Sequence, residues 1–319
     1  MTSGDIGALS IPPIEQQLET ILGAFNTDQR RLLWLSQGKG LTASEIKSAS
    51  SVLGLPKAMT DQGYGMIGEL CELVLRYLKE LESSATIQKK LLPEHPPELE
   101  GIDISVKYIP MMGVSGDYYD FLSIGKGKIG IALGDVCGKG MSAAMLMACV
   151  RMALRAHLQT NPEAVGDLLV HLNKVVEQDA PESRFVTLAY GILDTSTQTF
   201  TYSNAGHPPV LHYQSAAGDV RKLNVGGCML GILDEIEYPA ETVTLENGDA
   251  LVFYTDGIIE ASNESEELFG IDRLRDVVAG HGAGSAESLQ DAILSATSRF
   301  SNQHWDDDVT VMVVKSLKS

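Results

Sequence analysis

The sequence of 319 residues is poor in cysteine, in long apolar runs and in positive charge. Its four cysteines are scattered and form no CxxC pair, which is typical of reduced thiols and argues against a disulfide framework. The longest uninterrupted apolar run, Ala143 to Val150, is too short to span a bilayer. Residues 1–14 contain no Lys or Arg, so we expect no signal peptide and a cytoplasmic location.

Basic residues are scarce mainly in the second part of the chain. Residues 1–90 carry nine Lys/Arg against ten Asp/Glu, whereas residues 91–319 carry fifteen against thirty-two. Such an acidic surface repels nucleic acid and anionic membranes, so we expect neither as a partner. Residues 42–59 are compatible with a helix-turn-helix, but they lack a basic recognition face, which argues against DNA binding.

The first part of the chain has a helical pattern, with apolar residues near a spacing of three and four. A seam of two heptads runs from Ile67 to Leu81, and Ser84 and Gln88 interrupt it. We therefore predict a helical regulatory or dimerisation module over residues 1–84. Residues 85–98 are expected to form a linker helix and a proline-rich turn.

Residues 99–319 show a different pattern, with β-branched runs of period two separated by longer helical segments. Helices are predicted over 142–158, 161–179 and 285–300, the second with Asn161 as N-cap and Pro162 in its first position. This order predicts an α+β domain of sheet packed on sheet with flanking helices. The expected strands cover 102–109, 128–136, 186–193, 200–203, 210–213, 250–254 and 309–314.

Four short acidic motifs occur in this second part. Each places an aspartate beside a glycine or at the edge of an apolar run, where a strand end can present a carboxylate. A single Asp-Gly pair is usually a turn, so the argument depends on the whole set. Carboxylates without His or Cys partners suit Mg²⁺ or Mn²⁺. The motifs are Gly116-Asp117-Tyr118-Tyr119-Asp120, Gly134-Asp135-Val136-Cys137-Gly138, Thr255-Asp256-Gly257 and Asp307-Asp308-Val309-Thr310.

With two further segments, these motifs resemble the bacterial branch of the metal-dependent PPM (PP2C-like) serine/threonine phosphatases. The segments are Ile87-Gln88-Lys89-Lys90-Leu91-Leu92-Pro93 and Asn204-Ala205-Gly206-His207-Pro208. The likeness is greatest to the SpoIIE/RsbU-type enzymes that control partner-switching pathways, and it covers residues 88–316. Each motif is weak alone, but all six occur in the family's order.

The resemblance implies a PP2C-like β-sandwich that hydrolyses phosphoserine or phosphothreonine on a regulatory protein, with a STAS-type anti-sigma-factor antagonist as the expected substrate. It also implies two or more Mn²⁺ or Mg²⁺ ions that activate a water molecule. An upstream regulator would act through the N-terminal helices, and homodimerisation is a further expectation. The alternative is a catalytically inactive scaffold that binds protein partners, although the full aspartate set argues against it.

The family's motifs also assign roles to individual residues. Asp135 would bridge both ions, with the carbonyl of Val136 as a further ligand. Asp256 and Asp307 would complete one ion's ligands, and Asp117 would hold an additional ion directly or through water. Asp135 and Asp117 are therefore the carboxylates expected to take part in catalysis.

Four other polar residues near these motifs are given supporting roles. Asp120 is expected to cap or orient backbone, and Asp308 to be a solvated or structural neighbour of the metal ligands. Lys139 is favoured as a solvated turn lysine over a phosphate ligand. For His207 there are two interpretations, a general acid and a residue that locks a turn, and the second is favoured.

The sequence also departs from other branches of the superfamily. Those branches carry an arginine before the first acidic motif, but none occurs between Lys107 and Asp117. They also carry a histidine two residues after the bridging aspartate, where this chain has Cys137. Phosphate binding is therefore expected to rest on metals and backbone, and the proton donor to the leaving group is unidentified. Cys137 lacks the CX₅R loop of covalent cysteine phosphatases, which argues against a nucleophilic role.

Overall fold

The computed structural model describes residues 61–111, 113–125, 127–180 and 184–317, so most of the predicted N-terminal module lies outside the described residues. The chain divides into two compact units, Met1–Ala85 and Thr86–Ser319. Helix α4 (Asp61–Leu91) begins in the first unit and ends in the second. The helix is continuous through Ser84 and Gln88, so the interruption of the apolar seam does not end it.

The second unit is built from two sheets, which we call the first and second sheet. Their strands are antiparallel apart from the short parallel pair β5–β8. The first sheet has the order β1 (Ile102–Ile109), β11 (Val309–Ser316), β10 (Ala250–Tyr254), β6 (Val210–Gln214) and β7 (Asp219–Leu223). The second has the order β2 (Tyr118–Gly125), β3 (Lys128–Val136), β4 (Val186–Asp194), β5 (Thr199–Ala205) and β8 (Gly226–Gly227), with β9 (Glu241–Thr244) also paired to β5.

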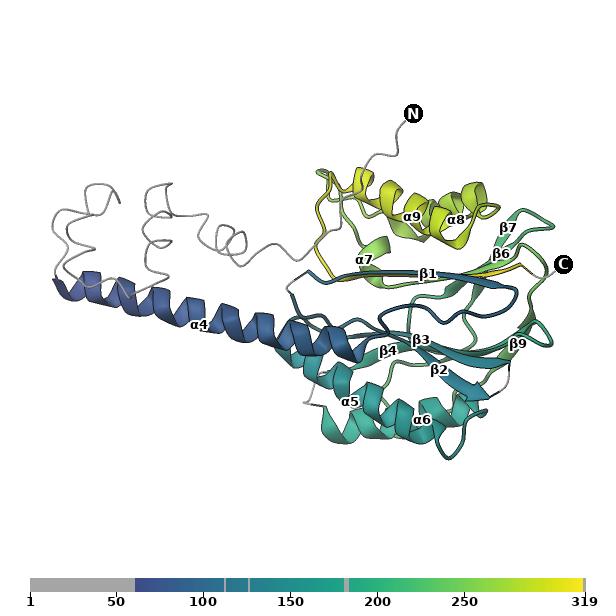
Figure 1. Ribbon diagram of the computed structural model, residues 1–319, viewed down its shortest axis with the longest axis horizontal. Helices are drawn as coiled ribbons and strands as arrows, with labels where there is room; N and C mark the ends of the chain where they lie inside the picture. The colour runs from purple at the N-terminus through teal and green to yellow at the C-terminus, as the bar shows by residue number, and fades with distance from the viewer. Residues whose placement is uncertain (1–60, 112, 126, 181–183, 318–319) are drawn as a thin grey trace. The chain divides into compact units, whose positions relative to one another are not determined.

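Helices cover the outer face of each sheet (Figure 1). Helices α5 (Met141–Leu158) and α6 (Val165–Asp179) pack on the second sheet, and α7 (Asp256–Ile259), α8 (Gly270–His281) and α9 (Ala286–Phe300) pack on the first. Among the described residues α5 alone is long and apolar enough to cross a membrane, but its buried side chains, including Met147 and Leu154, belong to the core. The expected sandwich with flanking helices is therefore confirmed.

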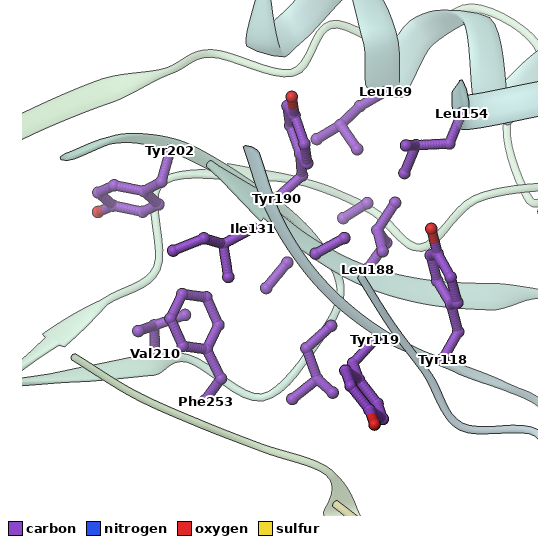
Figure 2. Close-up of a cluster of buried hydrophobic side chains, with 14 of the residues drawn as sticks. Tyr118, Tyr119, Ile131, Leu154, Leu169, Leu188, Tyr190, Tyr202, Val210 and Phe253 are labelled. Carbon is purple, nitrogen blue, oxygen red and sulfur yellow. The ribbon is translucent and has the colours of Figure 1, made fainter. Parts of the chain in front are cut away.

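Alternation along the strands separates the two cores of this unit. In β11, Met312 and Val314 join the larger core, whereas Val311 and Val313 join the core beneath α8 and α9. Figure 2 shows part of the larger core, where Tyr190, Phe253 and Leu169 come from both sheets and from α6. Because large side chains fill the space between the sheets, polar groups are left to the ends of the strands.

The predicted start of the second long helix is wrong. Helix α6 begins at Val165 after Ala164, and neither Asn161 nor Pro162 is helical. Asn161 instead contacts the carboxylate of Asp167 through its side-chain amide at 3.4 Å. The helix therefore begins about one turn after the residues predicted to cap it. The predicted starts of α5 and α9 agree with the structure within one residue.

Candidate active site

Asp117 and Asp135 come together because β2 and β3 are antiparallel neighbours. Tyr118 lies opposite Gly134 and Tyr119 opposite Leu133, so the residues that flank these pairs share one end of the second sheet. Asp117, Tyr119, Leu133 and Asp135 alternate onto the same face of the second sheet. This is the face towards the first sheet, because the ring of Tyr119 lies 6.1 Å from that of Tyr108 in β1, measured between centroids. The register thus places both carboxylates between the sheets.

The first sheet supplies the other acidic motifs at the same end. Thr255 and Asp256 follow β10, and Asp307 and Asp308 precede β11. A backbone hydrogen bond of 3.0 Å from Thr255 N to Thr310 O joins the two segments. Gly257 is required there because a Cβ at this position would lie 2.1 Å from the carbonyl oxygen of Asp308.

Hydroxyl groups of the first sheet hold the carboxylate of Asp117. Its Oδ2 atom accepts hydrogen bonds from Thr255 Oγ1, at 3.0 Å, and from Thr310 Oγ1. Its backbone N–H donates to Ser115 Oγ at 3.0 Å. Asp117 is fully buried, so these hydrogen bonds fix its side chain and join the ends of the two sheets.

Asp308 fixes the segment that leads into Asp117. Its carboxylate accepts the backbone N–H of Met111, at 2.6 Å, and of Gly116, at 3.1 Å. The side chain is buried, so the interpretation of Asp308 as a solvated neighbour is wrong and its structural role is the one observed. Asp306, by contrast, is exposed.

Gly116, which Asp308 holds by its backbone N–H, lies directly against Asp135. A Cβ at Gly116 would stand 2.9 Å from Asp135 Oδ1 and 2.8 Å from the carbonyl oxygen of Val136. The absence of a side chain at Gly116 therefore leaves room beside a carboxylate oxygen and a backbone carbonyl oxygen. These are the two ligands that the family motif assigns to Asp135 and Val136.

The carboxylates destabilise one another's charged forms. Burial, followed by repulsion from Asp135 and Asp308, raises the pKa of Asp117 well above its ordinary value. Burial and then the charges of Asp256, Asp307 and Asp308 raise the pKa of Asp135 to about 7, although a hydrogen bond with Asp117 opposes this. Burial and repulsion from Glu260 and Asp307 raise the pKa of Asp256 to about 6. Such a group of carboxylates is stabilised by a cation.

The donor set fits a hard cation that keeps several water ligands. Within the described ranges, no three His, Cys, Asp or Glu side chains converge closely enough to hold an ion by themselves. This excludes a preformed cage of protein ligands there, as a structural zinc site would have. Mg²⁺ is commonly held by one or two carboxylates and waters, and Asp117, Asp135 and the Val136 carbonyl provide such a set.

Lys139 lies close to the predicted ligand Asp307 and is more than a solvated turn residue. Its Nζ atom is 3.0 Å from Asp307 Oδ2 and also donates to the carbonyl oxygen of Asp306. Both side chains of the ion pair are over a third exposed, so we expect it to contribute little to stability. The ion pair thus places a positive charge beside Asp307.

His207 is buried, and burial lowers its pKa to about 3, so its imidazole is neutral at pH 7. Its Nδ1 atom lies 2.8 Å from Thr187 Oγ1, which contacts the backbone carbonyl of Asp135 at 3.4 Å. The turn itself is locked by Asn204, whose side chain bonds both the N–H and the carbonyl of His207. A neutral, buried imidazole argues against the general-acid interpretation.

Asp120 lies on the opposite face of β2 from Asp117. Its carboxylate accepts two hydrogen bonds from Arg155 of α5, at 2.8 and 2.7 Å, and one from the hydroxyl of Tyr118. Asp120 therefore joins the second sheet to α5 and is directed away from the other carboxylates.

Sequence reasoning missed several residues that support the site. Gln88, in the last turn of α4, donates to Ser115 O at 2.7 Å and accepts from Ser115 N at 3.0 Å. Thr255 and Thr310 were part of the quoted motifs, but their hydroxyl groups were given no role. Arg184, which precedes β4, lies outside all of the sequence motifs.

Comparisons with known proteins identify the family. A family model described as Stage II sporulation protein E (SpoIIE) matches residues 125–316. The phosphoserine phosphatase RsbU of Bacillus subtilis is 32% identical over 257 residues, which cover 79% of this chain and 76% of RsbU.

Solved structures show the same architecture. The RsbU and RsbW domains of Rv1364c from Mycobacterium tuberculosis match with a TM-score of 0.57 and 28% identity, covering 72% of this chain and 63% of that one. The SiaA-PP2C domain of Pseudomonas aeruginosa has a TM-score of 0.67 and covers 77% of this chain and 99% of its own. Its identity is 18%, so that likeness concerns the fold.

Proposed function

This chain belongs to the SpoIIE family and is a protein serine/threonine phosphatase, and from that premise we propose that it hydrolyses phosphoserine or phosphothreonine on a regulatory protein with two or more Mn²⁺ or Mg²⁺ ions. The single observation that supports the metal requirement is the group of buried and half-buried, mutually repelling carboxylates at one end of the sandwich. When bound, the ions would supply an activated water and neutralise charge in the transition state.

The chain's own residues bind and orient in this proposal. Asp135, with the Val136 carbonyl, and Asp117 would hold the ions from the second sheet. Asp256 and Asp307 would hold them from the first. The hydroxyl groups of Thr255 and Thr310 fix Asp117, and the two backbone contacts of Asp308 keep Gly116 against Asp135.

The proposed substrate is a phosphorylated STAS-type antagonist of an anti-sigma factor. Two similarities support this: RsbU is a phosphoserine phosphatase, and the Mycobacterium tuberculosis protein carries an RsbU domain and an RsbW domain. A cytoplasmic location, an upstream regulator acting on the N-terminal helices and homodimerisation belong to the same proposal.

The test is hydrolysis of p-nitrophenyl phosphate during a Mn²⁺ titration, with wild type, Asp135→Asn and Asp291→Asn in parallel. We expect saturable, Mn²⁺-dependent turnover in wild type and in Asp291→Asn, whose exposed carboxylate lies on α9. Asp135→Asn should lose at least a hundredfold in kcat while remaining folded, as its circular dichroism spectrum should show. Equal turnover of the two variants would contradict the proposed metal role, and a wild type inactive at all Mn²⁺ concentrations would favour the scaffold alternative.

A further inference from the structure

Arg184 is an arginine beside the candidate site that has no role in the assignments so far. It precedes β4, and the carbonyl of its neighbour Phe185 accepts the N–H of Cys137 at 3.0 Å. This contact extends the β3–β4 pairing beyond its last pair, Val136 and Val186. The side chain of Arg184 therefore starts next to the loop that leaves β3 and enters α5.

The guanidinium group lies across that loop. It donates through Nη1 to the carbonyl oxygen of Cys137 and through Nη2 to Ser142 Oγ at 3.1 Å. A Cβ at Gly138 would overlap Nη1 at 1.6 Å, and Gly138 has a φ of 95°. The loop thus depends on glycine both for its backbone conformation and for the room that the guanidinium occupies.

The charge of Arg184 is not neutralised by the contacts that the structure shows. Arg155, Arg221 and Arg273 are each bonded to a carboxylate, of Asp120, Glu241 and Glu267 respectively. In the described part of the chain, the hydrogen bonds of Arg184 go to a carbonyl and a hydroxyl oxygen instead. A guanidinium has five N–H donors, so two contacts leave donors for a further acceptor.

The carbonyl that Arg184 bonds belongs to a residue two positions after Asp135, a separation of roughly 7 Å along an extended chain. This is within the range over which a long arginine side chain can change its partner. A phosphate bound at Asp135 would add negative charge to an already acidic site. Lys139 is ion-paired with Asp307, whereas the hydrogen bonds that the structure shows for Arg184 go to uncharged oxygens.

We propose that Arg184 binds the phosphate group of the substrate, and the released inorganic phosphate, through paired hydrogen bonds from its guanidinium. This rests on the proposed phosphatase function and supplies the phosphate-binding arginine that the segment before Asp117 lacks. Arginine suits this role because its planar guanidinium matches two phosphate oxygens at once, whereas lysine acts as a point charge.

Binding of inorganic phosphate to the Mn²⁺-loaded full chain tests the proposal directly by calorimetry. We expect Arg184→Gln to weaken phosphate binding by roughly ten- to a hundredfold, as loss of a charge-assisted contact predicts, and to raise the KM for p-nitrophenyl phosphate in parallel. Arg184→Lys should recover part of the affinity. Arg221→Gln removes an exposed arginine that is bonded to Glu241, and it should leave phosphate binding unchanged.

Mn²⁺ affinity and melting temperature separate phosphate binding from support of the loop. In Arg184→Lys we expect the Mn²⁺ affinity to stay within twofold of wild type and the melting temperature to stay within about 2 °C of it. An Arg184→Gln protein that binds phosphate like Arg221→Gln, or that loses Mn²⁺ and phosphate affinity equally, would overturn the proposal. If the wild type bound Mn²⁺ and phosphate without hydrolysing esters, the proposed function would fail. The ratio of the phosphate affinities of wild type and Arg184→Gln would still decide whether Arg184 binds phosphate.

Discussion

Asp135 and Asp256 make the stability of the metal-free protein depend on pH. Their pKa values are raised to about 7 and about 6, so the folded protein binds protons in a range where the unfolded chain has released them. Stability should therefore rise as the pH falls from about 7 to about 5 and decrease as the pH rises through those values. We expect this from melting temperatures measured in EDTA.

Two comparisons isolate the carboxylates from other titrating groups. Asp135→Asn should have a smaller slope of melting temperature against pH than wild type or Asp291→Asn, because one of the titrating groups is gone. Saturating Mn²⁺ should reverse the slope in wild type, since a cation favours the ionised carboxylates. Identical slopes for Asp135→Asn and wild type would show that Asp135 is not the group responsible.

Asp120 illustrates a carboxylate with a purely structural role. It is fully buried and bonded by Arg155, whose side chain is 41% exposed, so the pair is only partly removed from water. Asp120→Ala should lower the free energy of unfolding by about 2 kcal/mol, below the usual cost of breaking a fully buried pair. Urea unfolding measures this, and Mn²⁺ affinity of the folded variant should match wild type because Asp120 faces α5.

At the scale of the elements, Gly257 holds α7 against the start of β11. A side chain there would collide with the Asp308 backbone, so Gly257→Ala should push Asp256 away from the other carboxylates. We expect a loss of about 1–3 kcal/mol in stability and at least tenfold weaker Mn²⁺ binding. Gly280→Ala is the matched control, because a Cβ at Gly280 of α8 has no atom within 4 Å. Equal Mn²⁺ affinity of the two variants would contradict the packing argument.

Local patterns predicted the elements whose sequence and environment agree. Strands β1, β3, β10 and β11 are β-branched runs bounded by turns, and Ser285 caps α9 by accepting the N–H of Ser288. Strand β2 was missed because Asp120 in its interior is unfavourable in a strand. The contact with Arg155 of α5 stabilises Asp120 in the strand, and no local sequence pattern encodes that tertiary contact.

The site was predictable to the same extent. The aspartates could be named from their motifs, because each occurs at a strand end, beside glycine or at the edge of an apolar run. The contacts of Asp308 with Gly116 and of Thr310 with Asp117 could not, because they join segments more than 190 positions apart. Arg184 was missed since its relation to Cys137 arises from the β3–β4 pairing, and its sequence surroundings carry no motif.

At the scale of the whole molecule, the end of α4 is linked to the candidate site. Gln88 is buried and bonds both backbone groups of Ser115, whose hydroxyl in turn accepts the N–H of Asp117. The unit Thr86–Ser319 includes Gln88 and has its own cores. Residues 86–319 should therefore fold and bind Mn²⁺ like the full chain.

A shorter fragment, residues 93–319, lacks Gln88 and leaves two buried backbone groups of Ser115 without these partners. Each unsatisfied group costs about 1–3 kcal/mol, so we expect at least tenfold weaker Mn²⁺ binding than for residues 86–319. In the full chain, Gln88→Ala should reproduce the effect, and Ile87→Ala, at a side chain that is 62% exposed, should not.

Calorimetry of Mn²⁺ binding to the two fragments and the two variants tests the link between Gln88 and the site. Sedimentation of the full chain and of residues 86–319 tests the predicted dimerisation through residues 1–84. Equal Mn²⁺ affinity of both fragments would show that α4 is dispensable for the site. Equal affinity together with the same number of subunits in solution would also remove the basis for a regulatory or dimerisation role of the N-terminal helices.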